Sequence, residues 1–235
     1  MSEVVIAGSL LSADLSNLEK EFDKFVEWGL EVMHVDVMDG HFAPNLTFGP
    51  GVFEKLSGKI RIPVDIHLMV EKPMDYLDRF ADIFNVGGFV SGRNWYGIHL
   101  EVYMKDGFMD SDLLKKDLIE IASKGFLTTI VINPDTDIKF LESFLSEDLI
   151  DKVLVMTVWP GFSGQVMIEK CLDKVSQVVK MVANSGVYVS VDGGVNSDTI
   201  PKVHDSGADF IVSGSYLMKS STKDEFEKKL NLLQG

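Results

Sequence analysis

Eight short apolar segments alternate with eight amphipathic segments along the 235 residues, and no linker or low-complexity tract interrupts them. Short runs rich in Val and Ile are typical of buried strands, whereas apolar residues spaced three and four apart are typical of helices. The expected strands cover residues 4–10, 32–38, 62–69, 95–101, 126–132, 152–158, 187–192 and 209–214. The expected helices cover 15–28, 50–57, 73–84, 111–124, 136–146, 167–184, 196–206 and 222–233.

Local signals support these boundaries. Asp14, Pro50, Pro73 and Asp135 are helix-start signals, and Gly29, Gly125, Gly186 and Gly207 stand just before a strand, where a helix end favours left-handed backbone. Eight strand-then-helix units predict an α/β protein with one (β/α)8 TIM-barrel domain over residues 1–235. A doubly wound open sheet is the alternative, but its G-x-G-x-x-G fingerprint is absent after the first strand, where Ser9-Leu-Leu-Ser-Ala-Asp stands.

One segment departs from this pattern. Residues 85–97 are rich in glycine and aromatic residues and are longer than an ordinary connection between a helix and a strand. We interpret this segment as an insertion at the bottom of the barrel, either a contact surface or a plain surface loop.

The charge and composition exclude several classes of protein. A formal net charge of −14 argues against a nucleic-acid partner, which calls for a basic face. It does not exclude a small phosphorylated ligand, because backbone N–H groups bind phosphate locally. No apolar run reaches the roughly 18 residues of a membrane span, and Met-Ser-Glu-Val-Val lacks the basic start of a signal peptide. With Cys171 as the only cysteine, we expect a cytoplasmic protein without a membrane partner.

Two pairs of titratable residues interrupt apolar runs, His34-Val-Asp36 and Asp65-Ile-His67. Residues two apart in a strand point to the same face. Burying charge is costly unless the group is paired or bound to metal, so these pairs indicate a site. In a TIM barrel, functional residues lie at the carboxyl ends of the strands.

The residues expected at that rim form a candidate metal site. His34, Asp36, His67 and Asp192 all fall at strand ends, with Ser9 and Gly214-Ser215 on the same rim. Imidazole and carboxylate ligands suit one divalent ion of Zn, Fe, Mn or Co. Asp65, two residues before His67, is expected deeper in the barrel as a hydrogen-bonded support.

Asp36 and Asp192 suggest the chemistry. They come from different strands, so they would approach a substrate carbon from opposite sides, one removing a proton and the other returning it. Such two-sided transfer inverts the carbon, and a metal would stabilise the enediolate that forms.

Apolar and glycine-rich residues complete the candidate site. Met38, Met69 and Met156 end their strands and either line the site or simply pack there. Three glycine-containing loops are candidates for phosphate binding. They contain Gly161-Phe162-Ser163-Gly164, Gly193-Gly194 and Gly214-Ser215.

Long motifs make the chain resemble the ribulose-phosphate 3-epimerase family along nearly its whole length. The motifs are Ser9-Leu-Leu-Ser-Ala-Asp14, His34-Val-Asp-Val-Met-Asp-Gly-His-Phe-Ala-Pro-Asn-Leu-Thr47, Asp65-Ile-His-Leu-Met-Val70, Val131-Ile-Asn-Pro134, Met156-Thr-Val-Trp-Pro-Gly-Phe-Ser-Gly-Gln165, Val191-Asp-Gly-Gly-Val195 and Ser213-Gly-Ser215. The resemblance implies a ribulose-phosphate-binding barrel that interconverts D-ribulose 5-phosphate and D-xylulose 5-phosphate in the pentose phosphate pathway. It also implies a homo-oligomer, a dimer or a hexamer.

The resemblance assigns roles to the matching residues. His34, Asp36, His67 and Asp192 would bind the metal, and Asp36 and Asp192 would be the catalytic acid and base. The substrate would contact Ser9, His67, Met38, Met69, Met156, Gly161, Phe162, Ser163, Gly164, Gly193, Gly194, Gly214 and Ser215.

The chain also departs from the family pattern. Trp159 stands where the family usually has Asn or Asp, and His99-Leu100-Glu101 stands for the usual His-Pro-Glu. The chain is also similar to the related allulose-6-phosphate 3-epimerases, which act on a hexulose phosphate, and these are an alternative. A phosphate-binding barrel decarboxylase is disfavoured because Met38 occupies the position of its lysine. A non-catalytic sugar-phosphate-binding relative is disfavoured because all four ligands are present.

Overall fold

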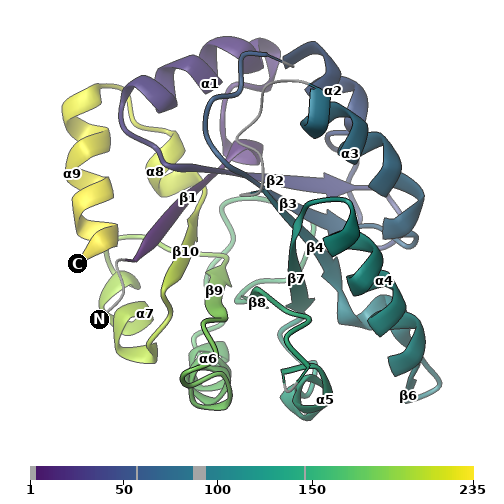
Figure 1. Cartoon of the computed structure of the whole chain (residues 1–235). Coiled ribbons are helices and arrows are strands. Elements are labelled where there is room, and N and C mark those ends of the chain that lie inside the picture. The colour runs from purple at the N-terminus through teal and green to yellow at the C-terminus, as the bar shows by residue number, and fades with distance from the viewer. Residues whose placement is uncertain (1–3, 57, 87–93, 146) are drawn as a thin grey trace.

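Eight parallel strands close into a barrel in the computed structural model, which describes residues 4–56, 58–86, 94–145 and 147–235. Around the barrel the strands follow the order β1-β10-β9-β8-β7-β4-β3-β2. Helices surround the strands (Figure 1). The predicted single-domain (β/α)8 TIM barrel is confirmed, and closure excludes the open doubly wound sheet.

All eight predicted strands are present, each within a few residues of its expected bounds. They are β1 (Val5–Ser9), β2 (Val32–Met38), β3 (Val64–Met69), β4 (Trp95–His99), β7 (Leu127–Ile132), β8 (Lys152–Met156), β9 (Tyr188–Asp192) and β10 (Phe210–Ser213). A short hairpin of β5 (Met104–Lys105) and β6 (Phe108–Met109) lies outside the barrel and was not predicted. Its strands have two residues each, too few to show a period of two.

The helices follow the predicted order. They are α1 (Leu18–Glu27), α2 (Pro50–Leu56), α3 (Leu77–Val86), α4 (Ser111–Ser123), α5 (Glu142–Leu145), α6 (Cys171–Met181), α7 (Ile200–Ser206), α8 (Ser215–Met218) and α9 (Lys223–Gln234). Short 3-10 turns are η1 (Leu10–Ser12), η2 (Leu15–Asn17), η3 (Pro73–Tyr76), η4 (Leu100–Tyr103) and η5 (Ile138–Leu141). Among the described helices, none is both long and apolar enough to cross a lipid bilayer.

Some predicted helix boundaries were wrong. The helix expected over 136–146 is the turn η5 followed by four α-helical residues, and its cap is Asp137 rather than Asp135. The Asp137 side chain accepts a hydrogen bond from the Lys139 N–H, which favours a tight turn over a regular helix start. Helix α8 was missed because four residues give no periodicity.

The segment 85–97, predicted to be an insertion, overlaps two described elements. Residues 85–86 belong to α3, and residues 95–97 belong to β4. Asn94 is described and buried, with its Oδ1 accepting a hydrogen bond from the Val64 N–H, and residues 87–93 lie outside the described residues.

The barrel interior has an apolar floor. It is formed by Val32, Trp95 and Phe210, each the first residue of its strand, and the same apolar cluster extends through Ala7, Val131, Leu154 and Val212 to Met156 at the end of β8. The rings of Trp95 and Phe210 meet edge to face, with centroids 5.4 Å apart. A much larger apolar cluster joins the outer faces of the strands to the helices. The interior therefore offers low dielectric to any polar group placed above this floor.

The four glycines predicted before strands all adopt positive φ. Gly29 has φ +101°, and Gly125, Gly186 and Gly207 lie between +77° and +87°. At the end of α1, the Gly29 N–H donates to Val26 O and the Leu30 N–H donates to Phe25 O, the Schellman pattern. Left-handed backbone is therefore what lets α1 stop and turn into β2.

Gly29→Ala should destabilise the protein by about 1 kcal/mol, because a left-handed residue with a Cβ is strained. A Cβ at Gly29 meets no atom within 4 Å, so the cost is purely conformational. Gly51→Ala is the matched control, since Gly51 lies in α2 and also has free space. We expect that control to be neutral or stabilising by about 0.5–1 kcal/mol. Denaturant unfolding of both variants checks the prediction, and equal effects would contradict it.

Candidate metal and substrate site

Strands β2, β3 and β9 carry the candidate ligands to one rim of the barrel. In the parallel register, His34 lies beside Asp65 and Asp36 lies beside His67. Asp192 is the last residue of β9. The end of β2 is held by Thr47, whose hydroxyl donates to Asp36 O at 2.6 Å and accepts from the Met38 N–H at 2.9 Å. The rim position of Asp36 is thus fixed through its own backbone.

The side chains of His34, Asp36, His67 and Asp192 converge, with one potential ligand atom from each lying within 4.8 Å of all the others. His34 Nε2 is 3.2 Å from Asp36 Oδ1 and 3.6 Å from Asp192 Oδ2. His67 Nδ1 is 3.1 Å and 3.8 Å from the same two oxygens. Two nitrogens and two oxygens therefore face a common centre.

The far nitrogen of His34 is bonded deeper in the barrel. His34 Nδ1 lies 2.8 Å from Asp65 Oδ2, and both residues are buried. The prediction that Asp65 is a hydrogen-bonded support is confirmed. A carboxylate partner keeps the proton on Nδ1 and directs the lone pair of Nε2 to the centre, as in carboxylate–histidine–metal triads.

The far nitrogen of His67 leads to two residues that were not predicted to take part. His67 Nε2 is 2.9 Å from His99 Nε2, and His99 Nδ1 is 2.9 Å from Glu101 Oε2. Glu101 Oε1 accepts the Asn133 N–H. If Nδ1 of His67 binds a cation, its Nε2–H donates to His99, and the Nδ1–H of His99 donates to Glu101. The sequence signal for this relay was His99-Leu-Glu101, another polar pair spaced two apart.

The pKa values of the buried groups reflect this network. Burial lowers the pKa of His34, but the Asp36 and Asp65 carboxylates outweigh it and hold that pKa well above the usual range. Burial raises the pKa of Asp36, yet contacts with His34 and His67 hold it far below normal. Burial lowers the pKa of His99 to about 4 despite its bond to Glu101, so His99 is neutral at pH 7.

This donor set fits a divalent cation. Imidazole and carboxylate donors suit Zn, Fe, Mn and Co alike. Both imidazoles have their outer nitrogens bonded, which fixes the ring orientation that binding requires. The predicted residues His34, Asp36, His67 and Asp192 are therefore brought together at one place in the fold.

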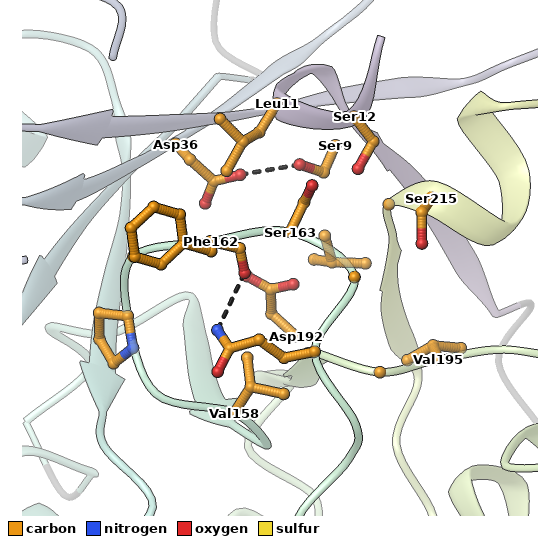
Figure 2. Close-up of a pocket in the computed structure, with 18 of the residues that line it drawn as sticks. Ser9, Leu11, Ser12, Asp36, Val158, Phe162, Ser163, Asp192, Val195 and Ser215 are labelled. Atoms are coloured by element: carbon orange, nitrogen blue, oxygen red, sulfur yellow. Dashed lines mark hydrogen bonds between the residues drawn. The ribbon is translucent and has the colours of Figure 1, made fainter. Parts of the chain in front are cut away.

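A cavity of about 330 Å³ opens above the cluster, with Asp36 and Asp192 in its wall. The Ser9 hydroxyl donates to Asp36 Oδ2 at 2.8 Å, and Figure 2 shows the two side chains facing one another. His34 and His67 are almost fully buried and lie below the wall. The carboxylates are thus the members of the cluster that reach the cavity.

The other predicted substrate residues also line this cavity. They are Met38, Met69, Met156, Gly161, Phe162, Ser163, Gly164, Gly193, Gly194, Gly214 and Ser215. His67, which was also predicted to contact the substrate, does not line this cavity. Trp159 and Lys219 line the cavity as well, and about half of the Trp159 side chain is exposed.

The loops around the cavity need glycine for close packing. A Cβ on Gly193 would lie 2.9 Å from Val158 N, and one on Gly194 would lie 2.4 Å from Met167 N. Across the cavity, the Asn45 side chain donates to Gly161 O at 2.8 Å. The loop after β8 is thereby tied to the loop after β2, and the mouth of the cavity is preformed.

Sequence comparison relates the chain to one family. The model of the ribulose-phosphate 3 epimerase family matches residues 5–218. A ribulose-phosphate 3-epimerase of Treponema pallidum is 41% identical over 89% of each chain. One from Bacillus subtilis is 34% identical over 99% of each chain, and one from Serratia marcescens is 37% identical over 92% of this chain and 95% of its own.

Solved structures support the fold alone. A mutant tryptophan synthase α-subunit from Pyrococcus furiosus superposes with a TM-score of 0.63 at 14% identity, covering 99% of both chains. A structure described as KGPDC from Streptococcus mutans gives a TM-score of 0.61 at 16% identity over the whole of both chains. At such low identity the shared property is the barrel.

Adding Zn²⁺, Mn²⁺ or Co²⁺ to chelator-treated protein should raise its melting temperature. At a free concentration of 100 Kd, binding stabilises by about 2.7 kcal/mol, or about 5–11 °C for a chain of this size. The shift should shrink at lower pH, because the raised pKa of His34 means that a proton competes for Nε2. Differential scanning calorimetry measures it.

His67→Ala should abolish this thermal shift, whereas His41→Ala should keep it. His41 is exposed and lies outside the cluster. An undiminished shift in His67→Ala would remove that residue from the metal site.

Proposed function

The chain belongs to the ribulose-phosphate 3-epimerase family, and we propose that it is a metal-dependent ketose-phosphate 3-epimerase that interconverts D-ribulose 5-phosphate and D-xylulose 5-phosphate. The observation that carries the proposal is the convergence of two carboxylates on one centre in the cavity wall, Asp36 from β2 and Asp192 from β9, strands that β1 and β10 separate around the barrel. The names of the relatives supply the substrate class, a phosphorylated ketose.

The proposed substrate orientation follows from the chemistry of the cavity wall. The phosphate would lie against the glycine loops at Gly193-Gly194 and Gly214-Ser215, which line the cavity and can offer backbone N–H groups to an anion. The ketose carbons C2 and C3 would then extend toward Asp36 and Asp192. Lys219 at the same end of the cavity adds a positive charge suited to a phosphate.

Epimerisation at C3 requires a base on each face of that carbon. One residue, as a carboxylate, takes the C3 proton, and the electron pair passes onto the C2 carbonyl oxygen to give a 2,3-enediolate. The other residue, in its carboxylic acid form, delivers its proton to the opposite face of C3 as the C2 carbonyl forms again. Asp36 Oδ1 and Asp192 Oδ2 face the two imidazoles, which leaves the second oxygen of each for the proton. Ser9 donates to Asp36 Oδ2 and so orients that oxygen.

A divalent cation held by His34, Asp36, His67 and Asp192 would supply positive charge for the oxygens at C2 and C3. The three methionines Met38, Met69 and Met156 contribute an apolar surface without competing hydrogen-bond donors. Low dielectric around the reacting carbon strengthens every charge interaction with the enediolate.

Incubation with D-ribulose 5-phosphate in deuterated water should place deuterium at C3 and build up D-xylulose 5-phosphate, as followed by NMR. Asp36→Asn and Asp192→Asn should each reduce turnover by at least about 10³-fold, because each removes one of two required bases. Asp23→Asn is the control, since Asp23 is exposed on α1. Absence of exchange on any pentulose or hexulose phosphate would refute the proposal, and an active Asp36→Asn or Asp192→Asn would remove that residue from the acid/base pair.

The second candidate substrate is D-allulose 6-phosphate. The bulky Trp159 at the cavity rim argues against this longer sugar. We expect a higher kcat/KM for the pentulose phosphate, because the indole occupies space that a longer sugar needs. Trp159→Asn should raise the hexulose-to-pentulose ratio of kcat/KM by about 10-fold, the scale of one steric contact. A ratio that favours the hexulose in the unaltered protein would reverse the assignment.

A further inference from the structure

Lys152 is the first residue of β8, and its side chain is completely buried in the barrel. Among the described residues, no other lysine or arginine is classed as buried. A buried ammonium is costly, and an apolar side chain of similar length commonly serves stability as well or better. The position of this charge therefore calls for a reason beyond packing.

The contacts of Lys152 hold its ammonium in one place. Its Nζ lies 2.6 Å from Asp65 Oδ2. The centroid of the Phe210 ring is 3.9 Å away and that of the Trp95 ring is 5.1 Å away, distances at which aromatic faces attract a cation. Burial lowers the pKa of Lys152, and the Asp65 carboxylate opposes this effect.

Lys152 is linked through Asp65 to the candidate metal cluster. The same oxygen, Asp65 Oδ2, meets both Lys152 Nζ at 2.6 Å and His34 Nδ1 at 2.8 Å. The His34 ring then presents Nε2 to the cluster. Lys152 itself does not touch any of the four candidate ligands in the described contacts, so its influence passes through Asp65 and through its charge.

The charges in this part of the barrel give a simple count. As carboxylates, the form in which they bind a cation, Asp36, Asp65 and Asp192 contribute three negative charges, and Lys152 contributes one positive charge. The remainder is two negative charges, which a divalent cation neutralises. Glu101 lies outside this count because it is further from the cluster: its carboxylate meets the neutral imidazole of His99, and only His99 meets His67.

We propose that Lys152 is a positioning residue of the metal site: it cancels the charge of Asp65, so that Asp65 can orient His34 while the site as a whole remains matched to a divalent cation. The inference rests on the metal dependence of the proposed function. It assigns Lys152 an electrostatic role, whereas a residue that merely fills the barrel would act only on stability.

The proposal predicts a specific pattern of affinities for Co²⁺, measured by chelator competition on chelator-treated protein and by the visible absorption of the bound ion. Asp65→Asn leaves the ammonium of Lys152 unpaired beneath the cluster, so Co²⁺ affinity should fall by about 10–100-fold, the scale of outer-shell changes. Adding Lys152→Met to that variant removes the unpaired charge. The double variant should return to within about threefold of the unaltered protein, because the amide oxygen introduced by Asp65→Asn can still accept the His34 Nδ1–H.

Lys152→Met alone should bind Co²⁺ at least as tightly as the unaltered protein, because it removes a positive charge that repels the cation. Its kcat should fall with KM little changed, because the loaded site then has one excess negative charge against an anionic enediolate. Lys202→Met is the control: it removes an exposed lysine paired with Glu169 and should alter neither affinity nor kcat.

A double variant that binds Co²⁺ as weakly as Asp65→Asn, or more weakly, would overturn the proposal. Thermal unfolding of the metal-free proteins shows whether each single variant folds. If one does not, the double variant, whose net charge equals that of the unaltered protein, still tests the inference. A Co²⁺ affinity near that of the unaltered protein supports the inference, and a 10-fold or greater loss refutes it. The proposed function fails separately, if the unaltered protein binds no Co²⁺ or exchanges no deuterium at C3. If the unaltered protein binds no Co²⁺, the inference about Lys152 fails together with the proposed function.

Discussion

The hydrogen bond between His34 Nδ1 and Asp65 Oδ2 is the contact on which the candidate site depends. It joins neighbouring strands β2 and β3 inside the barrel, where low dielectric makes an unpaired polar group expensive. The bond fixes the tautomer of His34, and the tautomer decides that Nε2 faces Asp36 and Asp192. A one-residue slip of β3 against β2 would turn Asp65 and His67 to the outer face of the barrel together.

The two imidazoles of the cluster are supported in different ways. His34 bonds an anionic partner that is itself paired with a buried ammonium, whereas His67 bonds the neutral imidazole of His99. A carboxylate partner raises the basicity of an imidazole more than a neutral partner does. The site thus combines one strongly and one weakly donating nitrogen with two carboxylates. The ammonium of Lys152, held against the rings of Trp95 and Phe210, offsets the charge of Asp65.

The cavity depends on backbone as much as on side chains. Gly193 and Gly194, directly after Asp192, have positive φ and pack against the backbone of Val158 and Met167, so the loop after β9 can approach the loop after β8. Asn45 ties that second loop to the one following β2. Strand ends therefore supply the chemistry, and interlocked loops supply a fixed opening above it, as expected when function is placed on a barrel rim.

Local pattern was enough to predict the eight strands, the barrel, and His34, Asp36, His67 and Asp192 as its candidate ligands, because side-chain direction in a strand follows a period of two and parallel strands end on one rim. It also placed Asp65 as a support. It did not identify His99, Glu101 or Lys152 as partners. His99, on β4, and Glu101, in the turn after it, reach the cluster through the register of β3 with β4. Lys152 is on β8, which is not a neighbour of β3, and meets Asp65 only because the barrel closes. Which buried group lies beside which is decided by register and closure, and these are properties of the assembled barrel rather than of any one segment.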